Sequence, residues 1–143
     1  MEEKVTFIEQ RLGDMAEKIV TPVRVEDIEG RRFFEGTALW DTGAACTCIA
    51  KCVADVLKLD TLPFGQMVTP IGVKPCDVGA ILVFPGNVRR FIPMHTMVME
   101  GAQRECDVII GMDVIRRGDV SLYHDGEELV FRFDFGKKFK FRK

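Results

Sequence analysis

At residues 38–44 the chain reads Ala38-Leu39-Trp40-Asp41-Thr42-Gly43-Ala44. Three apolar residues lead directly into a carboxylate, and a glycine follows two positions after it. An apolar run that stops at Asp and Gly is typical of a strand that ends in a turn. The stretch therefore predicts a strand that delivers the side chain of Asp41 into the turn at its end.

A second short motif, Ile109-Ile110-Gly111, ends 111 − 41 = 70 residues after Asp41. With Val108 before it, this apolar, β-branched run predicts a buried strand that stops at a tight turn. Residues 112–117 then favour a short helix. Each motif is weak alone, because Asp before Thr-Gly is ordinarily a turn residue and an apolar pair before glycine is ordinarily core.

The two motifs together, in this order, resemble those of the retropepsin-like (retroviral-type) aspartic protease family. The continuation Met112-Asp113-Val114-Ile115, followed by Gly118-Asp119, is similar to bacterial members of that family. The resemblance covers about residues 19–135. It implies a mainly β chain folded as a closed β-barrel (the acid protease fold) with one or two short helices, in a single-domain half-site that dimerises.

The resemblance implies that Asp41 is the catalytic residue of an aspartic endopeptidase. Two carboxylates held about 3 Å apart cannot both ionise, so they share one proton and can activate a water against a peptide bond. The chain holds one Asp-Thr-Gly and no Asp-Ser-Gly. Activity then requires a homodimer in which each subunit supplies one Asp41, with a peptide or protein as substrate and no cofactor.

Further roles follow from the same resemblance. Thr42 is expected to hydrogen-bond across the dimer, and Gly43 to let the substrate strand approach closely. Thr47 is expected to hydrogen-bond Asp113, which ties the active-site loop to the short helix. The substrate-binding residues are Gly43, Ala44, Ala45, Gly72 and Ile109, and the structural residues of the second motif are Ile110, Gly111, Asp113 and Thr47.

Two features depart from or extend the retroviral pattern. Retroviral members usually carry an acid at the position of Ala45 and an arginine at that of Met112, which form an ion pair. Both partners are absent here, so no unpaired buried charge remains. The flap, a hairpin over the substrate, is expected at Val68–Pro75 with Gly72 near its tip.

Composition and length set the organisation of the chain. Its 143 residues, 47% apolar and 29% charged with a net charge of −2, predict one domain with a substantial core. We divide it into an N-terminal segment at 1–18, either a strand or an extension that covers the cleft, a protease domain at 19–135, and a basic tail at 136–143. The first 16 residues leave strand and helix open.

Periodicity predicts the other elements. Residues 19–25 and 32–40 favour a hairpin, and 79–84 and 88–99 favour further strands around a turn at 85–87. Phe131, Phe133 and Phe135 alternate with polar residues, which puts the three rings on one face of a strand. Apolar groups at Ile49, Val53, Val56 and Leu57 favour a helix over 49–57.

Several other function classes are disfavoured. The near-neutral charge argues against a nucleic-acid binder, and we interpret the tail's positive charges as a solvated edge strand. No apolar run is long enough to span a membrane, and the start Met1-Glu2-Glu3-Lys4 lacks the features of a signal peptide, so we expect a cytoplasmic protein.

The cysteines and histidines suggest no site of their own. The odd cysteine number and the missing export signal favour reduced thiols and no metal site, since paired C-x2-C spacings are absent. The two histidines have no carboxylate or nucleophile at a recognisable spacing. The residues concerned are Cys46, Cys48, Cys52, Cys76, Cys106, His95 and His124.

The rival hypothesis is a dimer of the same fold that is catalytically silent or latent and binds a peptide or partner protein without cleaving it. An intact Asp41-Thr42-Gly43 favours the enzyme.

Overall fold

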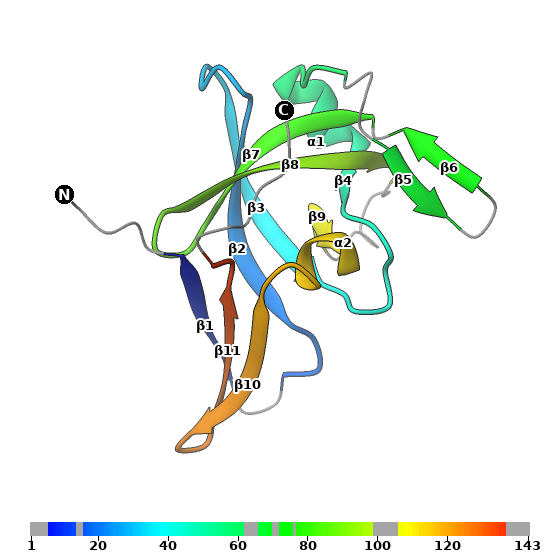
Figure 1. Cartoon of the computed structure of the whole chain (residues 1–143). Coiled ribbons are helices and arrows are strands. Elements are labelled where there is room, and N and C mark those ends of the chain that lie inside the picture. Colours follow the sequence, from blue (N-terminus) through cyan, green and yellow to red (C-terminus); the bar gives the residue numbers. More distant parts are fainter. Residues whose placement is uncertain are drawn as a thin grey trace.

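The computed structural model describes residues 6–13, 16–61, 66–69, 72–75, 77–98 and 106–136 (Figure 1). The chain is mainly β, as predicted, with eleven strands and two short helices in these residues. The strands form a closed barrel, a three-stranded sheet and a two-stranded hairpin. Outside the described residues lie 70–71 of the expected flap, Cys76, and the tail from residue 137 onward.

The closed barrel confirms the predicted architecture. Its β2 and β3 form the hairpin expected from the sequence, and β9 lies parallel to β3. Parallel neighbours end at the same edge of a sheet, so the residues that follow β3 and β9 lie side by side. The strand order is β2 (Val20–Glu26), β3 (Phe33–Trp40), β9 (Val108–Ile110), β4 (Cys48–Ala50), β8 (Val88–Met97) and β7 (Val78–Phe84), which pairs back with β2.

The three-stranded sheet joins the two ends of the chain. Its central strand is β11 (Glu128–Asp134), flanked by β1 (Phe7–Gly13) and β10 (Asp119–Asp125), with both pairings antiparallel. Residues 7–13, for which the sequence leaves strand and helix open, are therefore a strand. The strand β10 has no counterpart among the sequence predictions.

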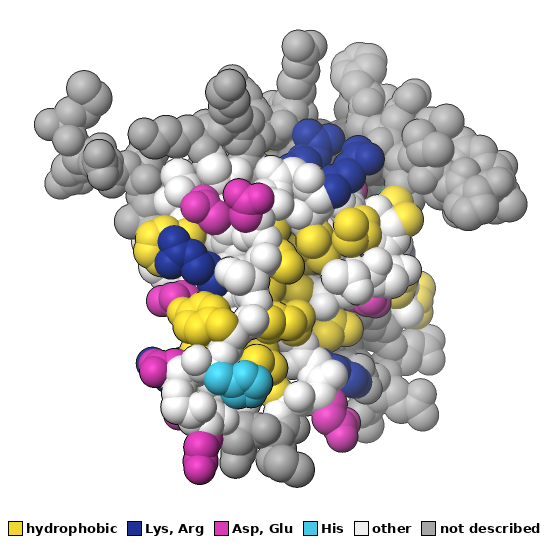
Figure 2. All heavy atoms as spheres, turned by 60° about the horizontal axis from the view of Figure 1, so that its bottom comes forward, with side chains coloured by type: hydrophobic (Ala, Val, Ile, Leu, Met, Phe, Trp, Pro, Cys, Tyr) yellow, Lys and Arg dark blue, Asp and Glu magenta, His cyan; other side chains and the backbone are white. Residues whose placement is uncertain are grey.

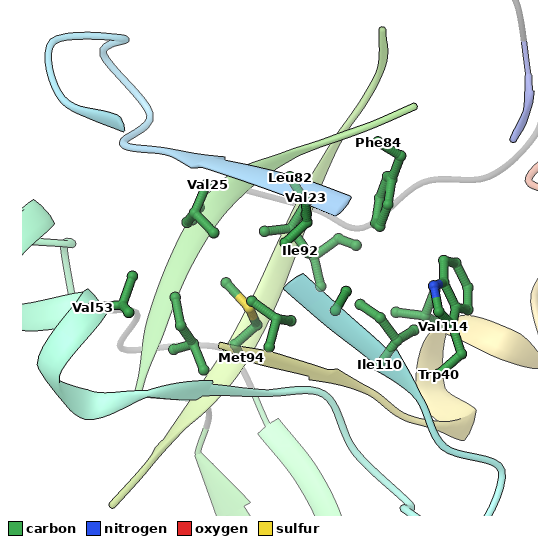
Figure 3. Close-up of a cluster of buried hydrophobic side chains, with 14 of the residues drawn as sticks. Val23, Val25, Trp40, Val53, Leu82, Phe84, Ile92, Met94, Ile110 and Val114 are labelled. Atoms are coloured by element: carbon green, nitrogen blue, oxygen red, sulfur yellow. The ribbon is translucent and has the colours of Figure 1, made fainter. Parts of the chain in front are cut away.

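Trp40 fills the junction between the barrel and this sheet. Its ring centroid lies 5.0 Å from those of Phe131 and Phe133, and 5.6 Å from that of Phe84. Its indole N–H donates to the Thr21 hydroxyl at 3.0 Å, so the one polar atom of the buried ring is satisfied. Figure 3 shows Trp40 beside the barrel's aliphatic core. The residue before Asp41 is thus anchored in the core.

Both predicted helices are present, but their bounds differ: the second, α2, ends at Ile115, two residues before the predicted end at Arg117. Helix α1 spans Lys51–Leu57, whereas the periodicity predicted a start at Ile49. Ile49 belongs to β4 instead, where it pairs with β8 and β9 and is fully buried. Val56, assigned to the apolar face, is 68% exposed. Ile49 joins a strand although its spacing suits a helix, because pairing in the barrel buries its side chain completely. The second helix, α2, spans Met112–Ile115.

A hairpin extends from the barrel where the flap was expected. Strand β5 (Gln66–Thr69) pairs antiparallel with β6 (Gly72–Pro75), and it begins two residues before the predicted Val68. Figure 1 shows the hairpin projecting from the ends of β7 and β8. No helix in the described part of the chain is both long and apolar enough to cross a bilayer.

Candidate active site

The position of Asp41 follows from the pairing of β3 with β9. The register matches Trp40 with Ile110, so Asp41 and Gly111 are the next residues on adjacent parallel strands. The Asp41 N–H donates to the Ile110 carbonyl at 2.9 Å, which extends the ladder by one more bond. The two sequence motifs, 70 residues apart, therefore meet at one end of the barrel.

The turn after β3 orients the Asp41 carboxylate. The Gly43 N–H donates to Asp41 Oδ1 at 2.8 Å, and the Ala44 N–H donates to the Asp41 carbonyl at 3.1 Å. Asp41 is partly exposed, and Thr42 and Gly43 are exposed. One carboxylate oxygen is thus held by the loop backbone while the turn stays open to solvent.

Thr47 and Asp113 form the hydrogen bond expected between them. The Thr47 hydroxyl donates to Asp113 Oδ1 at 2.7 Å, and the Thr47 N–H donates to Asp113 Oδ2 at 3.0 Å. The same hydroxyl accepts the Gly111 N–H at 3.1 Å. Thr47 is fully buried, so its hydroxyl is satisfied both as donor and as acceptor.

Backbone contacts pack the active-site loop directly against α2. The N–H groups of Met112 and Asp113 donate to the carbonyls of Ala44 and Ala45, at 2.8 and 3.2 Å. A side chain at Gly111 would place its Cβ 2.6 Å from the backbone of Cys46, so only glycine permits this approach. These bonds join Ala44 and Ala45 to α2 without the ion pair of the retroviral pattern.

The remaining predicted substrate residues lie on β9 and in the β5–β6 hairpin. Ile110 is fully buried, whereas its neighbour Ile109 is half-buried between Leu39 and Cys48 of the adjoining strands. Gly72 opens β6, paired with Thr69 next to the tip of the hairpin. The structure brings Asp41, Thr47, Gly111 and Asp113 together. The catalytic role of Asp41 and the substrate-binding roles of the other predicted residues stay predictions.

Asp107 is a structural residue that the sequence analysis missed. It is 7% exposed, and its Oδ2 accepts the Thr37 N–H at 2.9 Å. Its own N–H donates to the Thr37 carbonyl, and its carbonyl accepts the Ala50 N–H, both at 2.9 Å. Asp107 therefore joins β3, β4 and β9, the three strands that carry the motifs. A single Asp before an apolar run gave no signal for this role.

His95 has a carboxylate neighbour, contrary to the sequence reading. Its Nδ1 lies 3.7 Å from Oδ2 of Asp77, the residue two positions beyond β6. That oxygen also accepts the Thr96 N–H at 2.9 Å and the Thr96 hydroxyl at 2.7 Å. Partial burial raises the pKa of Asp77, but the Thr96 hydrogen bonds and nearby His95 outweigh it, so the pKa lies below its ordinary value. The contact ties the base of the hairpin to β8.

One hollow in the described part of the chain lies apart from Asp41. A hollow of about 400 Å³ next to β2, β3 and β7, lined in part by Arg24 and Glu35, includes none of the predicted site residues. Among the described residues, no three His, Cys, Asp or Glu side chains gather closely enough to hold a metal ion.

Comparison with known proteins bears on the fold. No protein-family model matches the chain, and no curated protein sequence does. Among solved structures, it is similar to a retropepsin-like aspartic protease from Rickettsia conorii, with 16% identity and a TM-score of 0.50. The match covers 93% of this chain and 97% of that chain. Together with the closed barrel, this similarity shows that the chain has the retropepsin-like fold.

Proposed function

We propose that the chain is an aspartic endopeptidase whose active site forms between two identical subunits. The observation that carries the proposal is the placement of Asp41: its carboxylate follows β3, Gly43 orients it, and its loop is joined to α2 through Thr47 and Asp113. A retropepsin-like barrel with an Asp-Thr-Gly in this turn supports a peptidase more directly than it supports a binding module.

The chemistry needs the Asp41 carboxylates of both subunits. With one proton shared between them, the ionised carboxylate takes a proton from a bound water as that water attacks the carbonyl carbon. The protonated partner supplies a proton to the substrate, and the amine leaves once its nitrogen is protonated. Water and the peptide bond are consumed, and a carboxylic acid and an amine are formed.

The rest of the site would bind an extended peptide. Thr42 would hydrogen-bond across the dimer and fix the two loops, and the exposed Gly43 leaves room for a substrate backbone. The β5–β6 hairpin would act as the flap, with Gly72 near its tip. Main-chain hydrogen bonds then supply affinity, and apolar pockets bordered by Ala44, Ala45 and Ile109 supply preference.

Digestion of a diverse peptide library at about pH 4 to 7.5, read by mass spectrometry, tests this function. We expect cleavage by the wild type and a loss of more than about 10³-fold in the Asp41→Asn variant. Asp55→Asn is the matched control, because it makes the same change at an exposed carboxylate on α1.

Equal cleavage by wild type and Asp41→Asn would overturn Asp41 as the catalyst. Silence from a wild type that is folded and dimeric would instead favour the rival, a dimer that binds peptides without cleaving them. Melting curves of all three proteins establish that the comparison is between folded molecules.

A further inference from the structure

The two legs of the β5–β6 hairpin are held at the same place, the start of β7. On the leg that enters the hairpin, Thr61 forms an antiparallel bridge with Val78, the first residue of β7. On the leg that leaves the hairpin, Asp77 directly precedes Val78. Figure 1 shows the hairpin projecting from the ends of β7 and β8. We call Thr61, Asp77 and Val78 the hairpin base.

Asp77 is bound to three consecutive residues of β8. Its N–H donates to the Met94 carbonyl at 3.0 Å. Its Oδ2 accepts the Thr96 N–H at 2.9 Å and the Thr96 hydroxyl at 2.7 Å, and it lies 3.7 Å from Nδ1 of His95. The point at which the chain leaves the hairpin is thus fixed to β8 through both the backbone and the carboxylate of one residue.

Carboxylates at the other end of the molecule make contacts of another kind. At the lower end in Figure 1, which Figure 2 brings forward, charged side chains surround a hydrophobic centre. Strand β10 ends with Asp125, which binds Arg11 at 2.6 Å, and both side chains are more than half exposed. Such exposed ion pairs fix little, because both side chains are solvated and mobile. Asp77 instead accepts from a backbone N–H and a short hydroxyl of a barrel strand, so its carboxylate has a defined position.

The part of β8 that binds Asp77 also holds the active-site loop. The His95 N–H donates to the Thr47 carbonyl at 3.1 Å. The Thr47 hydroxyl donates to Asp113 and accepts from Gly111, the residue that lies beside Asp41 at the ends of the paired strands. Close-packed interiors transmit displacements, because they hold little free volume. The hairpin base and the Asp41 loop therefore belong to one connected set of hydrogen bonds.

We propose that Asp77 is a positioning residue for substrate binding, and this proposal rests on the proposed function. Hinges of lids and loops lie at the ends of elements, where a few residues absorb the movement. The bonds from Asp77 to β8 fix the place from which the hairpin extends. Without these bonds the hairpin samples more positions, and the fraction of molecules with the hairpin closed over a peptide falls. The apparent affinity for substrate falls in the same proportion.

Steady-state kinetics of Asp77→Ala test the substrate role. This variant removes the acceptor of both Thr96 donors, and we expect the KM of a cleaved peptide to rise about tenfold while kcat changes by less than about threefold. Asp60→Ala is the matched control. Asp60 is an exposed residue on the other leg, where its backbone carbonyl, and not its carboxylate, accepts the Gly79 N–H. Asp60→Ala should keep both constants of the wild type.

Spin-label distances test the hairpin position without catalysis. Labels on non-natural residues at Val73 of β6 and Val56 of α1 report one distance within a subunit, in dimers that carry one labelled chain. Val56 suits the fixed label, because it is 68% exposed on a helix whose other face is buried. We expect a broader distance distribution in Asp77→Ala than in wild type and Asp60→Ala. A distribution as narrow as that of the wild type would overturn the proposal.

Thr96→Val gives a second route to the answer if Asp77→Ala does not fold. It removes only the hydroxyl donor, while the Thr96 N–H keeps its bond to Asp77. We expect the same two changes in smaller amount, with a KM about threefold above that of the wild type. A folded Thr96→Val protein with the KM and the distance distribution of the wild type contradicts the proposal.

The proposal and the proposed function fail separately. A broadened distribution in Asp77→Ala, with no Asp41-dependent cleavage by the wild type, keeps Asp77 as the residue that fixes the hairpin and rejects the enzyme. Asp41-dependent cleavage with an unchanged KM in Asp77→Ala keeps the enzyme and rejects Asp77 as a positioning residue.

Discussion

The Thr47 hydroxyl is the buried polar group that joins the candidate site to the segment after β9. It donates to Asp113 and accepts from Gly111, and both partners belong to the segment that follows β9. Because Thr47 is fully buried, water cannot replace either bond when the hydroxyl is removed. The cost of its loss is therefore that of unpaired buried groups rather than that of an ordinary hydrogen bond.

Thr47→Val should destabilise the fold by about 1–3 kcal/mol, because at nearly constant volume it leaves the buried Gly111 N–H without its acceptor and Asp113 Oδ1 with only the Val114 N–H. Thr47→Ser keeps the hydroxyl and should cost about 1 kcal/mol, the value of one buried methyl group. Urea denaturation of both variants measures the difference. Equal free energies of unfolding for the two would show that the hydroxyl is unimportant.

The titration of Asp77 gives a prediction for acid stability. Its folded-state pKa lies below the ordinary value, so its ionised form stabilises the fold. This contribution is fully present above the unfolded-state pKa of about 4 and is lost as the pH falls through the lowered folded-state pKa. Asp77→Asn should therefore lower stability relative to wild type at about pH 6, and the difference should shrink below about pH 3.

Urea denaturation at several pH values measures this difference in the free energy of unfolding. Asp60→Asn is the control, because Asp60 is also a carboxylate with an exposed side chain. A wild-type advantage that does not change with pH would contradict the assigned titration.

At the scale of elements, the motif-bearing strands depend on Asp107. Asp107 directly precedes β9, whose pairing with β3 begins at Val108. Its carboxylate accepts the N–H of Thr37, the residue of β3 just before that pairing. Gly36 leaves space for that carboxylate, because a Cβ there would lie 2.1 Å from Asp107 Oδ2. The β3–β9 register is thus fixed at the end opposite to Asp41.

Asp107→Ala should cost about 1–3 kcal/mol, since it removes the acceptor of the partly buried Thr37 N–H. Asp107→Asn keeps an acceptor oxygen at the same place and should retain more of the stability. Thermal melting compares the two, and amide exchange at Thr37 should accelerate only in the alanine variant. An asparagine variant as unstable as the alanine variant would indicate that the charge, and not the acceptor, stabilises the strands.

The elements with one buried face have a clear alternation of apolar and polar residues, and these elements were predicted well from the sequence. The β2–β3 hairpin and the strand with Phe131 and Phe133 alternate clearly because one face enters the core. Helix α1 was predicted two residues too long, since Ile49 satisfies helical spacing and barrel pairing equally well in sequence. Strand β10 was missed because both of its faces are exposed in a single chain, which leaves no periodic burial to detect.

The part of the candidate site that lies in or beside the two short sequence motifs could be predicted from the sequence. Asp41, Gly111, Thr47 and Asp113 were named from sequence and lie together. The pairing of His95 with Asp77 was not foreseen, because Asp77, just before β7, meets His95 of β8 only through the pairing of these two strands. Long-range contacts between single polar residues leave no local pattern.

At the scale of the whole molecule, the proposed mechanism makes one chain half of a site. The exposed turn after Asp41 is the surface that a second copy would complete. The cleavage rate per subunit should then depend on the protein concentration and on whether the partner subunit carries Asp41. A mixed dimer of wild type and Asp41→Asn has only one Asp41 carboxylate and is expected to be inactive.

Mixing wild type with Asp41→Asn tests the two-subunit site most directly. When the subunits exchange freely, an equal mixture should lower the cleavage rate per wild-type subunit to about half, and a ninefold excess of variant to about one tenth. Wild type added in place of the variant is the control, and the rate per wild-type subunit should then stay unchanged. Undiminished cleavage in mixtures whose heterodimers are detected by mass-tagged subunits would contradict a site built from two Asp41 residues.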